Sequence, residues 1–300
     1  MAGIIKTASL RNVRQRSVRI AATVFLLPAL IFLALYVVYP IIDSFMTSTV
    51  EWKNFGPNRK FIGFFNWLDL VRDTYFWSAF INNLKIMFLS LIFQVPFAMA
   101  LATFLDVADR KGYIFKIVWF IPYLLSSVAI GVLFKFSLAA GDGIFASISK
   151  LMGGGGVDLL GNPKAALYTV IGVVCWQYIP FYMVLYLAAY GTIPVELYEA
   201  ASIDGATRGQ YFWNVSLPML RPTIISGMTL SIIGSLKYFD LVYVMTEGNS
   251  GTELMATYMY RISFIRNNLG YGATVASGMF ILITLVALVV VSTLNRKTEI

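Results

Sequence analysis

Six long apolar segments dominate the hydropathy pattern of the chain, and polar or glycine-containing stretches separate each segment from the next. A helix needs about 20 mostly apolar residues to cross the hydrocarbon core of a bilayer, and each segment is long enough to do so. The pattern therefore predicts an all-α membrane protein with six transmembrane helices. Their approximate bounds are Ile20–Ile42, Ala79–Leu105, Ile114–Phe134, Ala165–Ala189, Thr223–Tyr243 and Tyr271–Leu294.

Basic residues cluster at the two ends of the chain, before the first apolar segment and after the last. Because cytoplasmic segments are enriched in Lys and Arg, the positive-inside rule predicts that both termini are cytoplasmic, which six spans permit. We expect a basic arm over residues 1–19, a transmembrane domain over 20–294 and a cytoplasmic tail over 295–300. The basic residues concerned are Lys6, Arg11, Arg14, Arg16, Arg19, Arg296 and Lys297.

The composition agrees with a membrane protein and excludes several kinds of chemistry. Apolar residues make up 58% of the chain and charged residues 13%, whereas a typical soluble domain is about one quarter charged. The chain has no His, and Cys175 is its only cysteine, so intramolecular disulfides, cysteine-rich zinc sites and histidine-based triads are excluded. We expect neither a metal site nor catalytic residues. The net charge of +8 does not indicate a nucleic-acid partner, because Lys and Arg stand between apolar segments and are not gathered into a stripe on a folded surface.

The longest predicted cytoplasmic connection, residues 190–222, has the features of a folded segment. Pro194 suits the start of a helix, Glu196 and Glu199 place negative charge near its positive end, and Gly205 is a natural stop. These signals predict a short helix over Val195–Asp204, followed by a turn-rich piece over 206–214. Large apolar residues in this connection suggest a docking surface, namely Tyr198, Ile203, Phe212 and Trp213.

The same connection carries a motif with fixed spacing. Glu199-Ala200-Ala201 is followed after three residues by Gly205 and after nine more by Val215-Ser216-Leu217-Pro218. This pattern resembles the EAA signature of the membrane subunits of ATP-binding-cassette (ABC) importers, with Val215 in place of Ile. The resemblance implies a type I ABC importer permease fold and a coupling helix that docks on an ATPase subunit. The residues to which it assigns that role are Glu199, Ala200, Ala201, Asp204, Gly205, Leu217 and Pro218.

Further stretches resemble the carbohydrate permeases of the maltose-transporter type within that family. The resemblance implies a multi-pass subunit of a bacterial or archaeal cell membrane that imports a sugar or oligosaccharide by alternating access. The stretches are Leu27-Pro28-Ala29, Tyr39-Pro40-Ile41-Ile42, Phe76-Trp77, Asn82-Asn83, Phe239-Asp240, Thr246-Glu247-Gly248 and Ala256-Thr257-Tyr258-Met259-Tyr260-Arg261.

The same resemblance implies several partners. They are a second, distinct permease subunit that completes a heterodimer, two cytoplasmic ATPase subunits and an extracytoplasmic solute-binding protein. ATP and Mg would be used by the ATPase subunits, and no cofactor is expected on this chain. Gly156 and Gly161 do have the spacing of a phosphate-binding loop, but Asn162 and Pro163 stand where such a loop needs Lys and Ser or Thr.

A sugar site needs hydrogen-bonding side chains among aromatic rings, and two spans offer this combination. In the fifth span, Ser231, Ser235 and Tyr238 have the spacing i, i+4 and i+7 of one helical face. In the fourth span, polar and aromatic residues surround Pro180. The alternative is that the serines allow close helix packing and the aromatics form interfacial belts. The predicted substrate path consists of Gln177, Tyr178, Tyr182, Ser231, Ser235 and Tyr238.

Three ionisable residues fall inside predicted spans, namely Lys85, Lys237 and Asp240. Such residues are functional candidates because burial of a charge in hydrocarbon is costly. All three lie near predicted outer span ends, which favours the alternative that their side chains extend to water, and Lys237 and Asp240 could form a pair. Asn82 and Asn83 are expected to cap or cross-link helices.

Three other functions are compatible with a membrane protein of this length. A permease for glycerol phosphate or a polyamine would favour several charges of one sign near its site. A membrane-embedded enzyme would need clustered carboxylates, and the pair Asp106 and Asp109 stands beside Arg110 and Lys111 as in an ordinary charged loop. An ion-coupled transporter would favour mid-membrane carboxylates and broken helices, which the sequence does not indicate.

Overall fold

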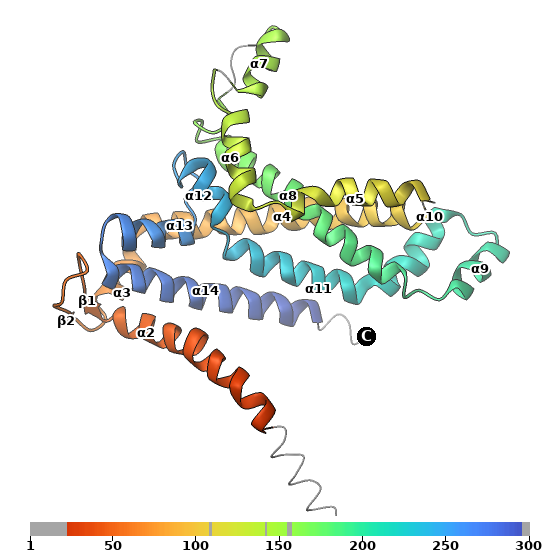
Figure 1. Cartoon of the computed structure of the whole chain (residues 1–300). Helices are drawn as coiled ribbons and strands as arrows, with labels where there is room; N and C mark the ends of the chain where they lie inside the picture. The colour runs from red at the N-terminus through yellow and green to blue at the C-terminus, as the bar shows by residue number, and fades with distance from the viewer. Residues whose placement is uncertain (1–22, 108–109, 142, 155–157, 296–300) are drawn as a thin grey trace, which may run out of the picture.

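The computed structural model describes residues 23–107, 110–141, 143–154 and 158–295. The predicted basic arm over 1–19 and the basic pair Arg296 and Lys297 lie outside the described residues. Within them the chain forms a bundle of long helices with short helices at both ends (Figure 1). Two strands of two residues each, β1 (Val50–Glu51) and β2 (Lys60–Phe61), pair antiparallel at one end. The prediction of an all-α membrane protein is confirmed, with this small hairpin as an addition.

Among the described residues five helices are long and apolar enough to span a membrane, and there are six spans if a bent pair of helices is counted as one. The first runs over Thr23–Thr47 and contains the π-helical turn η1 (Ala34–Val38) and α2 (Tyr39–Thr47). The others are α4 (Thr74–Val107), the pair α5 (Arg110–Leu124) and α6 (Ser127–Ser137), α8 (Ala166–Tyr190), the continuous helix Arg208–Leu236, and α14 (Leu269–Asn295).

The third predicted span, Ile114–Phe134, corresponds to a bent pair of helices and not to one continuous helix. The helix α5 ends at Leu124, Ser126 adopts an extended conformation, and α6 leaves at an angle of 91°. Close packing of α6 against α12 (Asp240–Thr246) accounts for the bend. A side chain at Gly131 would approach Val244 to 2.9 Å, so only glycine lets the two helices come this close.

The predicted bounds of the fifth span, Thr223–Tyr243, are wrong at both ends. The helix already begins at Arg208, because the capping box of Thr207 and Gln210 starts α10 (Arg208–Tyr211) where a turn-rich piece was expected. It continues through the π-helical turn η2 (Phe212–Ser216) into α11 (Leu217–Leu236). The helix ends at Leu236, and the chain breaks over 237–239 before α12 begins.

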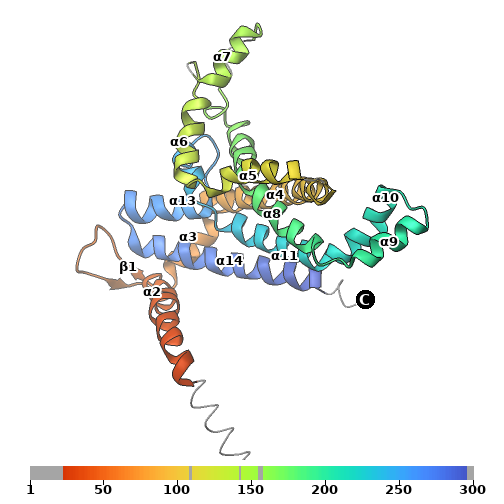
Figure 2. The same ribbon diagram turned by 45° about the vertical axis from the view of Figure 1, so that its right-hand side comes forward.

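The centre of the bundle is α8. Of the 18 most apolar consecutive residues of α8, 61% are buried, whereas 0% of the corresponding residues of the first span are buried. The helices α4, α5 and α11 pack around α8, whereas the first span diverges from the bundle (Figures 1 and 2). Fully buried residues of α8 include Val170, Met183 and Tyr186.

Short helices close the two ends of the bundle. One end carries the hairpin, α3 (Phe65–Arg72), α13 (Met255–Tyr260) and η3 (Arg261–Ile265), and α7 (Ile144–Leu151) projects beyond α6 (Figure 1). The opposite end carries α9 (Val195–Ile203) and α10. The predicted helix over Val195–Asp204 is confirmed to within one residue.

The contact between α8 and α11 depends on a glycine. A side chain at Gly227 would lie 2.5 Å from the hydroxyl oxygen of Tyr186, which is itself fully buried. In contrast, a side chain at Gly234 of the same helix would meet nothing within 4 Å. The ring of Tyr186 therefore requires the missing side chain at Gly227.

We expect Gly227→Ala to destabilise the chain by about 1–3 kcal/mol, because the added methyl group overpacks this contact. Gly234→Ala should be neutral or slightly stabilising, since alanine has the higher helix propensity. Thermal unfolding of the detergent-solubilised variants, followed by tryptophan fluorescence, measures the difference. Equal shifts of the transition temperature in both variants would contradict this account of the packing.

Candidate functional site

A cavity of about 580 Å³ lies between α4, α5, α8 and α11 and extends to the break after Leu236. It brings together five of the six predicted substrate-path residues from two helices far apart in sequence. These five are Tyr178, Tyr182, Ser231, Ser235 and Tyr238. The serines of α11 and the aromatic residues around Pro180 thus line the same cavity.

Aromatic rings form much of the wall of this cavity. Tyr123 of α5 stacks on Phe181 with ring centroids 5.2 Å apart, and Tyr178 meets Tyr238 edge to face at 6.0 Å. The hydroxyl of Tyr238 is buried and has no hydrogen-bond partner among the described residues. Rings that alternate with hydroxyl groups suit a ligand that has apolar faces and hydroxyl groups of its own.

Gln94 of α4 is a cavity residue that the sequence did not predict. Its side chain is buried, and its amide oxygen accepts a hydrogen bond from the Ser231 hydroxyl at 3.1 Å. The sequence offered one signal for this residue, namely an amide side chain inside the apolar segment Ala79–Leu105. Sequence spacing cannot show that this amide meets α11, because the contact joins residues 137 positions apart.

Gln177 does not line the cavity. Its side chain is buried, and its amide nitrogen donates to the hydroxyl of Ser127 at 3.1 Å. Ser127 is the first residue of α6, so this hydrogen bond holds the bend between α5 and α6 against α8. The role of Gln177 in a substrate path stays a prediction, and its position supports the wall of the cavity from behind.

The ionisable residues of the spans lie at exposed positions. Lys237 and Asp240 both line the cavity, and the ion pairs among the described residues do not include one between them. The suggested pairing is therefore wrong, because the break after Leu236 replaces the helical spacing that would have aligned the two side chains. Lys85 is also exposed, and its ammonium group lies 3.4 Å from the amide oxygen of Asn82.

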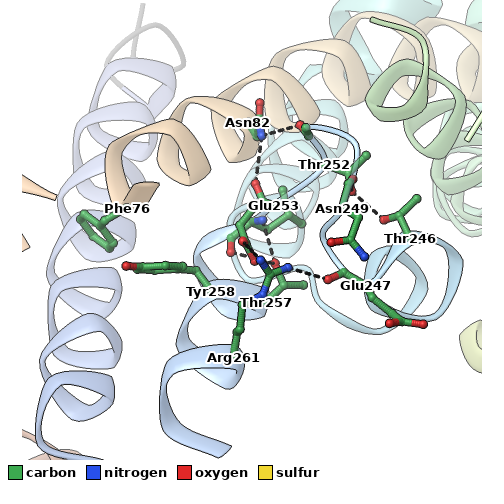
Figure 3. Close-up of polar contacts among 12 residues, drawn as sticks. Phe76, Asn82, Thr246, Glu247, Asn249, Thr252, Glu253, Thr257, Tyr258 and Arg261 are labelled. Carbon is green, nitrogen blue, oxygen red and sulfur yellow. Dashed lines mark hydrogen bonds and ion pairs between the residues drawn. The ribbon is translucent and has the colours of Figure 1, made fainter. Parts of the chain in front are cut away.

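A polar cluster holds the turn between α12 and α13 (Figure 3). The guanidinium of Arg261 pairs with the carboxylate of Glu253 at 2.9 Å and donates to the carbonyl oxygen of Glu247 at 2.8 Å. Burial raises the pKa of the Glu253 carboxyl above its ordinary value, while the neighbouring Arg261 acts in the opposite direction. Asn83 of α4 cross-links α11 and α13, as expected, whereas Asn82 bonds to the turn between α12 and α13.

The opposite end presents the predicted coupling residues on α9. Glu199, Ala200 and Asp204 are exposed and Ala201 is half-buried. Gly205 ends the helix with φ of +69°, and the amide of Ala206 donates to the carbonyl oxygen of Ala201. This is a Schellman motif, which requires a left-handed residue such as glycine at that position.

The remaining motif residues belong to another helix. Leu217 and Pro218 start α11, and Leu217 lines a separate apolar cavity with Phe212, Trp213 and residues of α4. The side chains of Ile203 and Trp213 are 86% and 67% exposed, so large apolar groups are available for docking at this end. One part of the motif therefore lies at the exposed helix α9, and the other part lies at the start of α11.

Residues 94–300 match the protein family described as "Binding-protein-dependent transport system inner membrane component". The "Putative ABC transporter permease protein ORF1" of Caldicellulosiruptor sp. is 56% identical over 46% of this chain and 100% of its own length. The "Arabinooligosaccharides transport system permease protein AraP" of Bacillus subtilis is 30% identical over 91% of this chain and 88% of its own. A chain in the crystal structure of a bacterial ABC transporter for alginate import has a TM-score of 0.80 and 26% identity, covering 96% of this chain and 98% of that one.

Proposed function

Because the chain belongs to the family of binding-protein-dependent transport system inner membrane components, we propose that it imports a sugar or oligosaccharide as a membrane-spanning subunit of an ABC importer. The cavity between α8 and α11 is the observation that carries this proposal. Its rings provide surfaces for sugar faces, and Ser231 with Gln94 provides hydrogen-bonding groups for sugar hydroxyls. The names of the arabinooligosaccharide and alginate relatives support the same substrate class.

The charges around the cavity favour a neutral solute over glycerol phosphate or a polyamine. Lys237 and Asp240 line it with opposite charges, so neither sign is in excess. An anionic or cationic solute would need several complementary charges to replace its hydration. A membrane-embedded enzyme is not favoured, because the described residues contain no cluster of three or more His, Cys, Asp or Glu side chains.

A second permease subunit completes the pathway in this proposal. The first span leaves the bundle and is 0% buried in its most apolar window, so this chain provides it with little packing (Figure 1). A related but distinct chain that packs against this span would form a heterodimer. Both termini and α9 would then lie in the cytoplasm, and the end with α3 and α13 would face the extracytoplasmic binding protein.

Energy would come from two ATPase subunits that bind ATP and Mg. The exposed α9 is the surface on which one of them would dock, with Glu199, Ala200, Ala201, Asp204 and Gly205 as contact residues. Closure of the ATPase pair would move α9 and shift the bundle between inward-facing and outward-facing packings, as in a two-state population shift. A loaded binding protein would bias the same equilibrium from outside.

One uninterrupted helix connects the two sites. The helix Arg208–Leu236 starts next to α9 and carries the cavity residues Ser231 and Ser235, and its 29 residues span roughly 43 Å at 1.5 Å per residue. Leu217 and Pro218 lie along this connection. A displacement of α9 therefore has a direct path to the wall of the cavity.

The assembly proposal is tested by gentle solubilisation of the tagged chain from its native membrane. We expect an ATPase subunit and a second six-span subunit to copurify, and ATP hydrolysis by this complex to rise when a sugar-loaded binding protein is added. Mass spectrometry and an ATPase assay measure both. Repeated recovery of the chain alone, with uptake retained, would contradict the proposal.

We expect Gly205→Val to lower sugar-stimulated ATP hydrolysis about ten-fold, because a β-branched residue is strained at φ of +69° and distorts the end of α9. Glu199→Lys should act in the same direction by reversing a charge on the docking surface. Gly209→Val is the matched control, since a side chain at Gly209 meets nothing within 4 Å and φ is not positive there. Normal stimulation in both test variants would exclude α9 as the coupling helix.

Removal of cavity hydroxyl groups should weaken uptake without affecting assembly. We expect Ser231→Ala and Tyr238→Phe each to raise the apparent KM for uptake about five-fold, the effect of one lost hydrogen bond. Ser226→Ala on the exposed face of α11 is the control, because its hydroxyl bonds to the carbonyl oxygen of Pro222. An unchanged KM in both test variants would mean that this face of α11 serves helix packing alone.

A further inference from the structure

Two consecutive asparagines of α4, Asn82 and Asn83, join parts of the chain that lie about 150 to 170 residues away in sequence. We define the outer cap as residues 240–265, which contain α12, the turn after it, α13 and η3. Both asparagine side chains are buried, Asn83 completely. Asn82 bonds to the turn between α12 and α13, and Asn83 bonds to the ends of α11 and α13. This difference in partners indicates separate roles.

Asn83 connects the carbonyl end of α11 to the amino end of α13. Its amide nitrogen donates to the carbonyl oxygens of Ser235 and Leu236 at 3.2 and 3.0 Å, and its amide oxygen accepts from the backbone N–H of Met255 at 2.9 Å. The last carbonyls of a helix and its first N–H groups have no partner within the helix. One buried side chain thus satisfies unpaired groups at both helix ends and links them.

Asn82 holds the cap in another place. Its amide nitrogen donates to the carbonyl oxygens of Gly251 and Glu253, both at 2.9 Å (Figure 3). The Arg261–Glu253 pair and the hydrogen bond between the Thr246 and Thr252 hydroxyls hold the same turn internally. The hydrogen bonds of Asn82 therefore fasten the cap to α4 alone, whereas those of Asn83 fasten it to the end of α11 as well.

The α11 residues that Asn83 holds belong to the cavity. The carbonyl oxygen of Ser235 accepts a hydrogen bond from the Asn83 amide nitrogen, and Ser235 lines the cavity together with Lys237 and Tyr238 of the break that follows. A shift of the cap at Met255 therefore moves the carbonyl groups of Ser235 and Leu236 through one side chain. The position of the cavity wall depends on the position of the cap.

We propose that Asn83 is a positioning residue that transmits movement of the outer cap to the wall of the sugar cavity. This inference rests on the proposed function, in which a sugar-loaded binding protein docks on the outer end of the bundle. Docking shifts the cap, Asn83 carries the shift to the end of α11, and Ser235 and Tyr238 move with it. The signal reaches the cavity without passing through the apolar contacts of the bundle.

The test compares Asn83→Ala with Asn82→Ala in the complete reconstituted complex. The two variants lose the same amide group from adjacent buried positions of one helix. We expect Asn83→Ala to leave basal ATP hydrolysis unchanged and to reduce its stimulation by saturating loaded binding protein about five-fold or more, which is a typical allosteric coupling. Asn82→Ala should keep stimulation within about two-fold of the unaltered complex, because the link to α11 remains. Ser78→Ala, at an exposed position of α4, controls for substitution in this helix.

A second measurement reports on the cavity directly. In a Cys175→Ser background, Gly234→Cys places one thiol in the cavity wall, where a side chain has room. We expect addition of the loaded binding protein to change the rate at which a methanethiosulfonate reagent labels this thiol. Asn83→Ala should abolish the change and Asn82→Ala should keep it. A merely structural role for Asn83 would leave the change intact.

Asn83→Leu provides a variant of similar shape, which removes both the donor to α11 and the acceptor for Met255. Equal loss of stimulation in the Asn82 and Asn83 variants, or full stimulation and labelling change in Asn83→Ala or Asn83→Leu, would overturn the proposal. Failure of both Asn83 variants to assemble would also count against it, since Asn83 would then be required for folding. Absence of stimulation in the unaltered complex would instead overturn the proposed function.

Discussion

The structure depends on the satisfaction of backbone polar groups in a medium that offers no water. In lipid every N–H and C=O needs an internal partner, so each interruption of a span requires a side chain that replaces the lost helical hydrogen bonds. At the break after Leu236, the Asn83 amide donates to the last carbonyl oxygens of α11. At the bend between α5 and α6, the Gln177 amide donates to the hydroxyl of Ser127 and holds the start of α6.

Two prolines of the spans, Pro40 and Pro218, are accommodated by a wider helical turn. The π-helical turns η1 and η2 each end two residues before a proline, Pro40 and Pro218. In each turn the residue before the proline donates its N–H five residues back, to Ala34 and Phe212. The wider turn leaves room for a ring that cannot donate, so the helix continues. The helix Arg208–Leu236, which joins the α9 end of the bundle to the cavity, continues past Pro218 by means of this turn.

Local sequence patterns predicted the features that depend on neighbouring residues. Hydropathy predicted the number of spans, and Pro194 and Gly205 predicted the bounds of α9. The spacing of Ser231 and Ser235 placed them on one face of α11, whereas Tyr238 reaches the same cavity from the break after Leu236. The bend at Ser126 and the break after Leu236 were not predicted, because they result from contacts between distant segments, such as Gly131 against Val244. Gln94 was missed for the same reason, since an isolated amide acquires its meaning from the helix that it meets.

The first span leads to a conclusion about biogenesis. Its apolar window has a mean hydropathy of 2.5 and is 0% buried within the chain. Lipid tails solvate such a helix as well as protein side chains do, so helix insertion and helix association are separate steps. This segment does not need the rest of the bundle in order to enter the bilayer. A newly made chain is therefore able to wait in the membrane with this helix in lipid, and assembly with the proposed second subunit would proceed by lateral diffusion.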